Sequence, residues 1–140
     1  MKRTLIFVFC CLTFCSFGQN LNTSQAQALE SPAKLAQMQL DAYNARNIED
    51  FLKPYADSVK IYNFPNTLIM DGKSAMRTAY ASMFQRTVNL HCELVNRMVM
   101  GDTVIDQERV TGIGDEPLKA IAIYKIRAGE IVEVYFIQGE

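Results

Sequence analysis

Apolar residues near position 40 recur at the spacing of an α-helix. Ala36, Leu40 and Tyr43 follow one another at intervals of four and three residues, which places them on one helical face. Ser31 before Pro32 is typical of a helix start, because serine caps free backbone N–H groups and proline fits the first turn. We therefore expect a helix that begins at Pro32.

Two more helices are predicted further along the chain. Asn47 has the character of an N-cap for a short helix that ends before Pro54. Asp71-Gly72 opens a third helix, whose apolar residues again follow helical spacing. This third apolar stripe consists of Met76, Tyr80, Met83 and Phe84.

Alternating or continuous apolar runs between turn residues predict the strands. A short pair, at 58–63 and 68–70, precedes the third helix. Four long strands follow it, at residues 90–100, 103–111, 118–127 and 131–138. Helices first and an antiparallel meander last is an α+β order, in which the helices cover one face of a strongly bent sheet and leave a concavity.

The first 18 residues have the pattern of a secretory signal peptide. Lys2-Arg3 forms a basic start, 5–17 contains no charged residue, and Gly18 supplies a small residue for cleavage. The apolar run is shorter than the roughly 20 residues that a transmembrane helix needs, so no transmembrane segment is predicted. We expect cleavage near Gly18, export to the periplasm or the exterior, a polar tether at 19–30 and one domain at 31–140.

Loss of the leader changes the charge and the cysteine count. Twelve of the 14 basic residues remain against 15 acidic ones, and a net charge of about −3 is unlike the basic surface that nucleic-acid binding needs. Three of the four cysteines lie in the leader, so Cys92 has no partner for an internal disulfide. Stability must then come from a hydrophobic core, which a chain of about 120 residues can bury.

The turn at Gly101-Asp102 predicts which residues of two strands lie opposite each other. A two-residue loop pairs Met100 with Thr103, and Arg97 with Asp106 as an attractive cross-strand pair. Since side chains alternate between faces, the two faces carry different sets. One set is His91, Glu93, Val95, Arg97, Asp106 and Glu108; the other is Leu90, Cys92, Leu94, Asn96, Met98, Met100, Ile105, Gln107 and Arg109.

The second set is more apolar, so we expect it to face the helices and the first set to be solvated. Asn96, Gln107 and Arg109 would then lie inside. Unmet polar groups in an apolar place cost about 1–3 kcal/mol each, so these side chains either satisfy one another and water or bind the polar atoms of a ligand. A β-bulge in the first of the two strands would exchange the faces beyond it.

The last two strands are apolar on both faces. A sheet of this kind usually has its outer face covered as well, and a second copy of the chain is the simplest cover. We therefore expect a homodimer. The two apolar sets are Ile121, Ile123, Val134 and Phe136, and Ala122, Tyr124, Ile126 and Ile131.

The segments 43–48 (Tyr-Asn-Ala-Arg-Asn-Ile), 55–57 (Tyr-Ala-Asp) and 72–76 (Gly-Lys-Ser-Ala-Met) resemble the nuclear transport factor 2-like superfamily, nearest its SnoaL-like and ketosteroid-isomerase-like branches. The resemblance covers roughly residues 33–136. It implies a cone-shaped barrel, with a strongly bent antiparallel sheet, three N-terminal helices and an apolar pocket at the open end. Members include isomerases, cyclases, dehydratases and pure binding proteins, so the fold does not decide the function.

The resemblance also shows that the catalytic positions of ketosteroid isomerase are replaced. It places that enzyme's tyrosine at Gln39, its basic aspartate at Asn63 and its second aspartate at Ala122. Amides donate and accept hydrogen bonds but take up no proton at neutral pH, so isomerisation by that mechanism is disfavoured. The same alignment points Gln39, Asn63 and Gln107 into the cavity.

Other chemistries find little support in the sequence. His91 and Cys92 are neighbours on a strand and point to opposite faces, so they do not form a nucleophile–base pair. A single histidine and the absence of ligand spacing predict no metal site. No Gly-rich phosphate loop follows a strand, and no cofactor is expected.

We therefore predict an exported protein that binds a small, largely apolar molecule of unknown identity. The alternatives are a lyase, isomerase or cyclase-type enzyme acting on a small apolar substrate, and a dimeric interaction module whose cavity is filled by its own side chains. The predicted ligand-binding residues are Gln39, Tyr43, Asn63, Phe64, Asn96, Met98, Ile105, Gln107, Arg109 and Tyr124.

Overall fold

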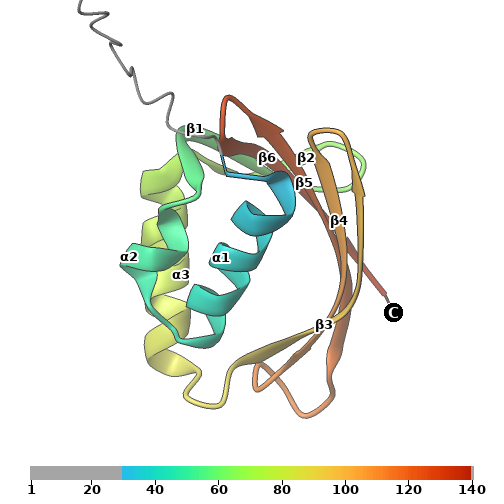
Figure 1. Ribbon diagram of the computed structural model, residues 1–140. Coiled ribbons are helices and arrows are strands. Elements are labelled where there is room, and N and C mark those ends of the chain that lie inside the picture. Colours follow the sequence, from blue (N-terminus) through green and yellow to red (C-terminus); the bar gives the residue numbers. More distant parts are fainter. Residues whose placement is uncertain (1–29, 140) are drawn as a thin grey trace, which may run out of the picture.

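The computed structural model of the protein describes residues 30–139 (Figure 1). The predicted signal peptide and all of the predicted tether except Glu30 lie outside the described residues. None of the helices within 30–139 has the length and apolarity that crossing a bilayer requires. The described elements are α1 (Pro32–Asn44), α2 (Ile48–Leu52), β1 (Tyr55–Asn63), β2 (Thr67–Asp71), α3 (Lys73–Arg86), β3 (His91–Met100), β4 (Thr103–Thr111), β5 (Leu118–Arg127) and β6 (Glu130–Gln138).

The helices begin where the sequence predicts them. The side chain of Ser31 accepts a hydrogen bond from the backbone N–H of Lys34 and caps α1, with Pro32 in its first turn. Asn47 caps α2 in the same way. Helix α3 follows Gly72, whose φ of +85° is a conformation that favours glycine. The expected apolar stripes face the core and are buried or partly buried.

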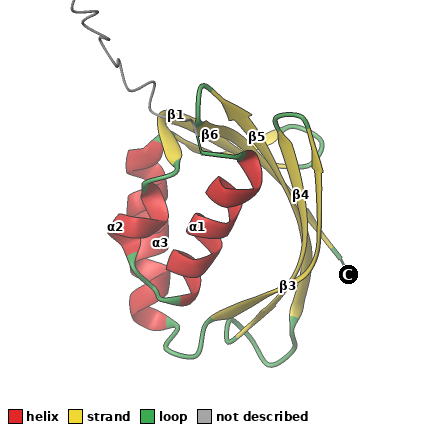
Figure 2. Cartoon of the chain, in the orientation of Figure 1, coloured by secondary structure: helices red, strands yellow, loops and turns green. Residues whose placement is uncertain are grey.

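The six strands form one curved sheet in the order β2-β1-β6-β5-β4-β3. All neighbours are antiparallel except β1 and β6, which run parallel. The three helices lie on the concave side of the sheet (Figure 2). The α+β class, the strongly bent sheet with three helices and the four-strand meander are confirmed. The expected cone-shaped barrel is confirmed only in part, because β2 and β3 are unpaired edges and the sheet is not closed.

Aromatic rings fix the three helices to each other. Phe51 of α2 lies 4.6 Å from Tyr80 of α3, measured between ring centroids, and Tyr43 of α1 lies 5.5 Å from Phe84. Edge-to-face and tilted ring pairs of this kind contribute about 0.5–1.5 kcal/mol each beyond the burial of their area. The three helices therefore pack together as one layer opposite the sheet.

The β3–β4 hairpin has the predicted register at its turn. Met100 lies opposite Thr103, and Arg97 lies opposite Asp106. Further from the turn, the pairing shifts by one residue between Leu94 and Asn96, so Val95 is a β-bulge. A bulge reverses the side-chain alternation of its strand.

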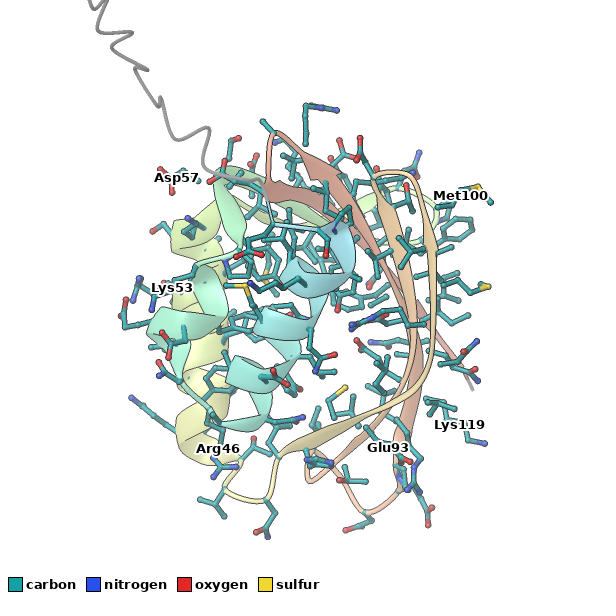
Figure 3. The ribbon with its side chains drawn as sticks, viewed as in Figure 1. Arg46, Lys53, Asp57, Glu93, Met100 and Lys119 are labelled. Atoms are coloured by element: carbon teal, nitrogen blue, oxygen red, sulfur yellow. The ribbon has the colours of Figure 1, made fainter. Side chains whose placement is uncertain are left out.

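The face assignment for this hairpin is therefore wrong over most of its length. Leu90 and Cys92 are buried as expected, but beyond the bulge Asn96, Met98 and Met100 are exposed. On β4 the alternation is the opposite of the predicted one, so Ile105, Gln107 and Arg109 lie on the outer face. Lys119, the cross-strand neighbour of Arg109, and Met100 project away from the helices in Figure 3. Asp106 and Glu108, expected in solvent, are buried.

Candidate functional site

A cavity of about 250 Å³ lies between the helices and the concave face of the sheet. Every helix and strand contributes to its lining, so the fold as a whole shapes it. Most of the wall is apolar. Its apolar side chains include Leu40, Phe51, Met83, Val110, Leu118 and Phe136.

The inner end of the cavity is polar and centres on Glu108 of β4. Glu108 is only 7% exposed, which is rare for a carboxyl group. The hydroxyl of Tyr124 on β5 donates a hydrogen bond to Glu108 Oε1 over 3.1 Å. Among the described cavity-lining residues, Glu108 is the only carboxylic acid.

Gln39 of α1 continues this polar group. Its Nε2 donates to the hydroxyl oxygen of Tyr124 over 2.9 Å and to the carbonyl oxygen of Ala36 over 3.1 Å. Its Oε1 accepts a hydrogen bond from the hydroxyl of Tyr55 over 3.3 Å. All three side chains are buried, so the amide of Gln39 is fully committed to the protein.

Burial raises the pKa of Glu108 from its ordinary value of 4.5 to about 7. Loss of hydration is the main cause, because burial penalises the charged form. The hydrogen bond from Tyr124 opposes the shift, the negative charge of Asp106 adds to it, and a hydrogen bond from the thiol of Cys92 and the charge of Arg97 lower it. Glu108 is therefore a group that changes protonation near neutral pH.

Asp106 occupies the same face of β4 but has a different environment. It is completely buried and forms two hydrogen bonds of 2.7 Å with Nε and Nη2 of Arg97. The remaining Nη1 of Arg97 donates to the carbonyl oxygen of Ala33 and to Oε1 of Gln37 on α1. Arg97 and Asp106 thus fasten α1 to the sheet, and neither of them lines the cavity.

The far end of α1 is also fastened to the sheet. Asn44 Nδ2 donates to the carbonyl oxygen of Cys92 over 2.9 Å, and Asn44 Oδ1 accepts from the N–H of Cys92 over 2.7 Å. With Arg97 at one end and Asn44 at the other, α1 is held across the sheet. This places Gln39, in the middle of the helix, over Tyr124.

The outer end of the cavity is accessible. Ile69 and Ile113, which line it, are 43% and 53% exposed. Asn63 and Gln138 are exposed lining residues with amide side chains. A molecule that enters here would meet amides first, then apolar walls, and Glu108 last.

Four of the ten predicted site residues lie in this cavity. Gln39, Tyr43, Asn63 and Tyr124 line it. The other six lie elsewhere: Phe64 is 57% exposed beyond the end of β1, and the bulge in β3 and the reversed alternation of β4 place the rest outside. These displaced residues are Asn96, Met98, Ile105, Gln107 and Arg109. Ala122, at an isomerase position, is buried on the inner face of β5.

Sequence reasoning missed Glu108, the central residue of the site. A signal was present, because Val104 and Val110 share its parity on β4, and both are buried. Two valines at the ends of an alternating Val-x-Asp-x-Glu-x-Val run indicate an inward face with two enclosed carboxyl groups. The apolar residues of β3 indicated the opposite face of β4, because the bulge at Val95 places alternate residues before and after it on different faces of the sheet.

The comparison with protein families matches the SnoaL-like domain to residues 36–134. The comparison with curated proteins finds no match. An uncharacterized cystatin-fold protein from Novosphingobium aromaticivorans superposes with a TM-score of 0.72 at 25% identity, covering 77% of this chain and 98% of that one.

Two further solved structures share the fold. A proposed ketosteroid isomerase from Kribbella flavida has a TM-score of 0.64 at 21% identity over 78% of each chain. A proposed polyketide cyclase from Sinorhizobium meliloti has a TM-score of 0.65 at 14% identity, covering 77% of this chain and 100% of that one. The family match covers well over half of the chain, and with these folds it shows that the protein belongs to the SnoaL-like domain family of the nuclear transport factor 2-like superfamily.

Proposed function

We propose that the cavity takes up a small, uncharged, largely apolar molecule and that Glu108 exchanges a proton with it. The observation that carries the proposal is the position of Glu108, a buried carboxyl group at the inner end of an apolar cavity. Its pKa of about 7 lets it give up and take up protons at neutral pH. A lyase, an isomerase and a cyclase can each begin with such a step.

The cavity supports a restricted class of molecule. Its volume of about 250 Å³ corresponds to about eight water molecules at liquid density and lies just below the roughly 300 Å³ of the smallest common ligand sites. The lining among the described residues contains no lysine, arginine or histidine. An anionic ligand would therefore meet Glu108 without a compensating cation. In our proposal Tyr43 contacts the apolar body of the ligand and Asn63 its outer end.

A general probe can test the proton transfer without knowledge of the natural ligand. 5-Nitrobenzisoxazole is small, neutral and flat, and a base that removes its C–H proton breaks the ring N–O bond and leaves a coloured cyanophenolate. Carboxylates in apolar surroundings are strong bases for this reaction because they are poorly hydrated. We expect the protein to accelerate the reaction, with a rate that rises with pH through about 7 as Glu108 ionises.

Two variants make the test specific. Glu108→Gln keeps an oxygen for the hydrogen bond from Tyr124 but cannot accept the proton, so it is expected to lose the acceleration. Gln107→Ala alters the next residue on the outer face and is expected to retain it. If the wild-type protein binds the probe but does not accelerate its opening, or if Glu108→Gln remains as fast, proton transfer by Glu108 is excluded.

Binding without catalysis is the second candidate function. The observation that favours it concerns the other titratable groups among the described cavity-lining residues. Burial raises the pKa of each of them above its ordinary value, so none exchanges a proton readily at neutral pH: the hydroxyls of Tyr43, Tyr55, Tyr80 and Tyr124 and the thiol of Cys92. Native mass spectrometry of the protein purified from its own host distinguishes the two functions. A co-purified molecule that stays unchanged on incubation with fresh protein supports binding alone, and a converted one supports an enzyme.

We also propose that the protein is exported and that a second copy covers the outer face of the sheet. Export rests on the leader pattern of residues 1–18. The cover rests on an apolar row that crosses all six strands in register. This row consists of Met98, Ile105, Ile123, Tyr135, Tyr62 and Leu68.

The neighbouring row of the outer face argues for a copy of the same chain as the cover. It carries Lys125, Glu133, Lys60 and Asp71 on successive strands. These charges alternate in sign, so a copy that lies against them in the reverse direction places each charge opposite one of the other sign. A two-fold axis parallel to the strands produces this arrangement and also brings the apolar rows together.

A further inference from the structure

Gln39 stands in the middle of a chain of hydrogen bonds that ends at Glu108. The hydroxyl of Tyr55 donates to Gln39 Oε1, Gln39 Nε2 donates to the oxygen of Tyr124, and the hydroxyl of Tyr124 donates to Glu108 Oε1. Each link is made by a buried side chain, so water does not compete for these groups. Which group donates and which accepts in each bond is therefore determined by the neighbouring protein groups.

The backbone carbonyl of Ala36 decides that direction. It lies 3.1 Å from Gln39 Nε2 and, as a carbonyl, can only accept. Turning the amide over would bring Oε1, a second acceptor, to the same place and would also remove the acceptor of the Tyr55 hydroxyl. The orientation of the Gln39 amide is thus fixed by the first helix itself.

Tyr124 has one arrangement left. Its oxygen accepts from Gln39 Nε2, so its single proton is directed to Glu108 Oε1. A carbonyl-type oxygen accepts a hydrogen bond better than the hydroxyl oxygen of a protonated carboxyl group. The proton of neutral Glu108 consequently belongs on Oε2, the oxygen that Tyr124 does not engage.

We infer that Gln39 is a positioning residue: backed by the Ala36 carbonyl, it orients the hydroxyl of Tyr124 and makes Oε2 the atom through which Glu108 exchanges its proton with a molecule in the cavity. The inference rests on the proposed role of Glu108 and specifies how that role is set up. It also gives a reason for an amide at this place, since a glutamate or an apolar residue could not donate to both Tyr124 and Ala36.

The test measures the pKa of Glu108 in the ligand-free protein by carbon-13 NMR of the glutamate side chains. Tyr124→Phe removes a hydrogen bond to the charged form and is expected to raise this pKa by roughly one to two units. Gln39→Met keeps the length of the side chain and removes the donor, so Tyr124 becomes a weaker and less well oriented donor. We expect it to raise the pKa by about half a unit.

The double variant separates positioning from a direct effect. If Gln39 acts through Tyr124, then Gln39→Met adds no shift when Tyr124 is already Phe, and the two effects are not additive. A residue that only fills space would leave the pKa of Glu108 unchanged in both backgrounds. No shift in the single variant, or the same shift in the presence and absence of the Tyr124 hydroxyl, overturns the inference.

Two further variants complete the set. Tyr55→Phe removes the bond to Gln39 Oε1 but leaves Ala36 in place, so it is expected to leave the pKa of Glu108 within about 0.2 units of the wild-type value. Gln39→Glu is the substitute test if Gln39→Met does not fold. Its carboxylate competes with Glu108 for the hydroxyl proton of Tyr124. It is therefore expected to raise the pKa of Glu108 more in the wild-type background than in the Tyr124→Phe background. An equal rise in both contradicts the inference.

The outcome for the proposed function is read separately from the same data. A wild-type Glu108 that titrates near 4.5 contradicts a proton-transfer role for this residue. If Glu108 titrates near 7 in the wild-type protein and Gln39→Met does not change its pKa, only the positioning role is contradicted.

Discussion

The two faces of strand β4 carry similar residue types in very different situations. Inward, Asp106 is fully buried against Arg97, and Glu108 is buried with Tyr124 as donor. Outward, Arg109 forms an ion pair with Glu93 in which both side chains remain about half exposed. Each face therefore has an Arg–carboxylate pair in which the partners lie opposite each other on β3 and β4.

The comparison shows that burial, and not the identity of the paired residues, determines how much an ion pair contributes to stability and how far the pKa of a carboxyl group shifts. An exposed pair is hydrated and screened, and contributes about 0–1 kcal/mol. A buried pair loses hydration on both sides, so removing one partner leaves a charge that neither water nor protein stabilises. Only inside does a carboxyl group without a cationic partner, Glu108, acquire a pKa near neutrality.

The largest effect is expected from breaking the inner pair. Arg97→Ala leaves Asp106 buried without a partner and also removes the hydrogen bonds to Ala33 and Gln37. We expect it to lower the free energy of unfolding by about 3–5 kcal/mol, measured by urea denaturation. A loss below about 1 kcal/mol would mean that Asp106 is hydrated and that β4 does not turn this face inward.

The second prediction concerns the pH dependence of stability and uses Glu108. Its pKa is raised in the folded state, so the folded protein holds this proton more tightly than the unfolded chain between pH 4.5 and about 7. Stability from this group is therefore fully present below pH 4.5, falls as pH rises through this window, and stays at its lower level above pH 7. The full difference amounts to about 3 kcal/mol.

Glu108→Gln isolates this contribution. The glutamine side chain does not ionise, so its contribution to stability does not change with pH. The free energy of unfolding of the variant minus that of wild type should therefore rise by about 3 kcal/mol between pH 4.5 and 8. All other carboxyl groups are shared by the two proteins, and their contributions cancel in the difference. Parallel stability curves across this range would show that Glu108 is not desolvated.

Much of the fold could be predicted from local signals. Capping residues such as Ser31 and Asn47 act on the backbone within three residues, so they mark helix starts without reference to the rest of the chain. The Gly101-Asp102 turn fixed its nearest cross-strand pairs for the same reason. The family resemblance of segments 43–48, 55–57 and 72–76 reflects these local features and was confirmed.

The site could be predicted only in part, because its key feature depends on one non-local irregularity. The bulge at Val95 inserts a residue that no turn or cap announces, and it exchanges the faces of β3 beyond it. Asp106 can be buried because Arg97 forms hydrogen bonds with it. Burial of Glu108 costs the hydration of its carboxylate, and no residue near it in the sequence indicates that this position is buried. Positions where residue type contradicts burial are the ones at which function is to be expected.

The third prediction tests the outer face as a dimer surface. Ile123 lies in the middle of the apolar row, between Ile105 and Tyr135. Ile123→Lys would place a charge in the apolar centre of the proposed contact and should weaken association by about 2 kcal/mol, or roughly thirtyfold in the dissociation constant. Light scattering over a dilution series measures it, and a wild-type protein that is monomeric at all concentrations excludes the dimer.

The smallest effect on stability is expected for Arg109, which the sequence predicted as a ligand-binding residue and which lies on the outer face. Arg109→Ala removes an ion pair that is about half exposed on both sides, so the free energy of unfolding should change by no more than about 0.5 kcal/mol. The rate with 5-nitrobenzisoxazole should also stay as in wild type, because Arg109 does not line the cavity. Arg97 and Arg109 are both paired with acids across the same two strands. The identity of the residues alone therefore gives no reason why Arg97→Ala should lose at least about six times as much free energy of unfolding as Arg109→Ala. A loss of stability close to that of Arg97→Ala would therefore mean that Arg109 is enclosed, and the inner and outer faces of β4 would have to be exchanged.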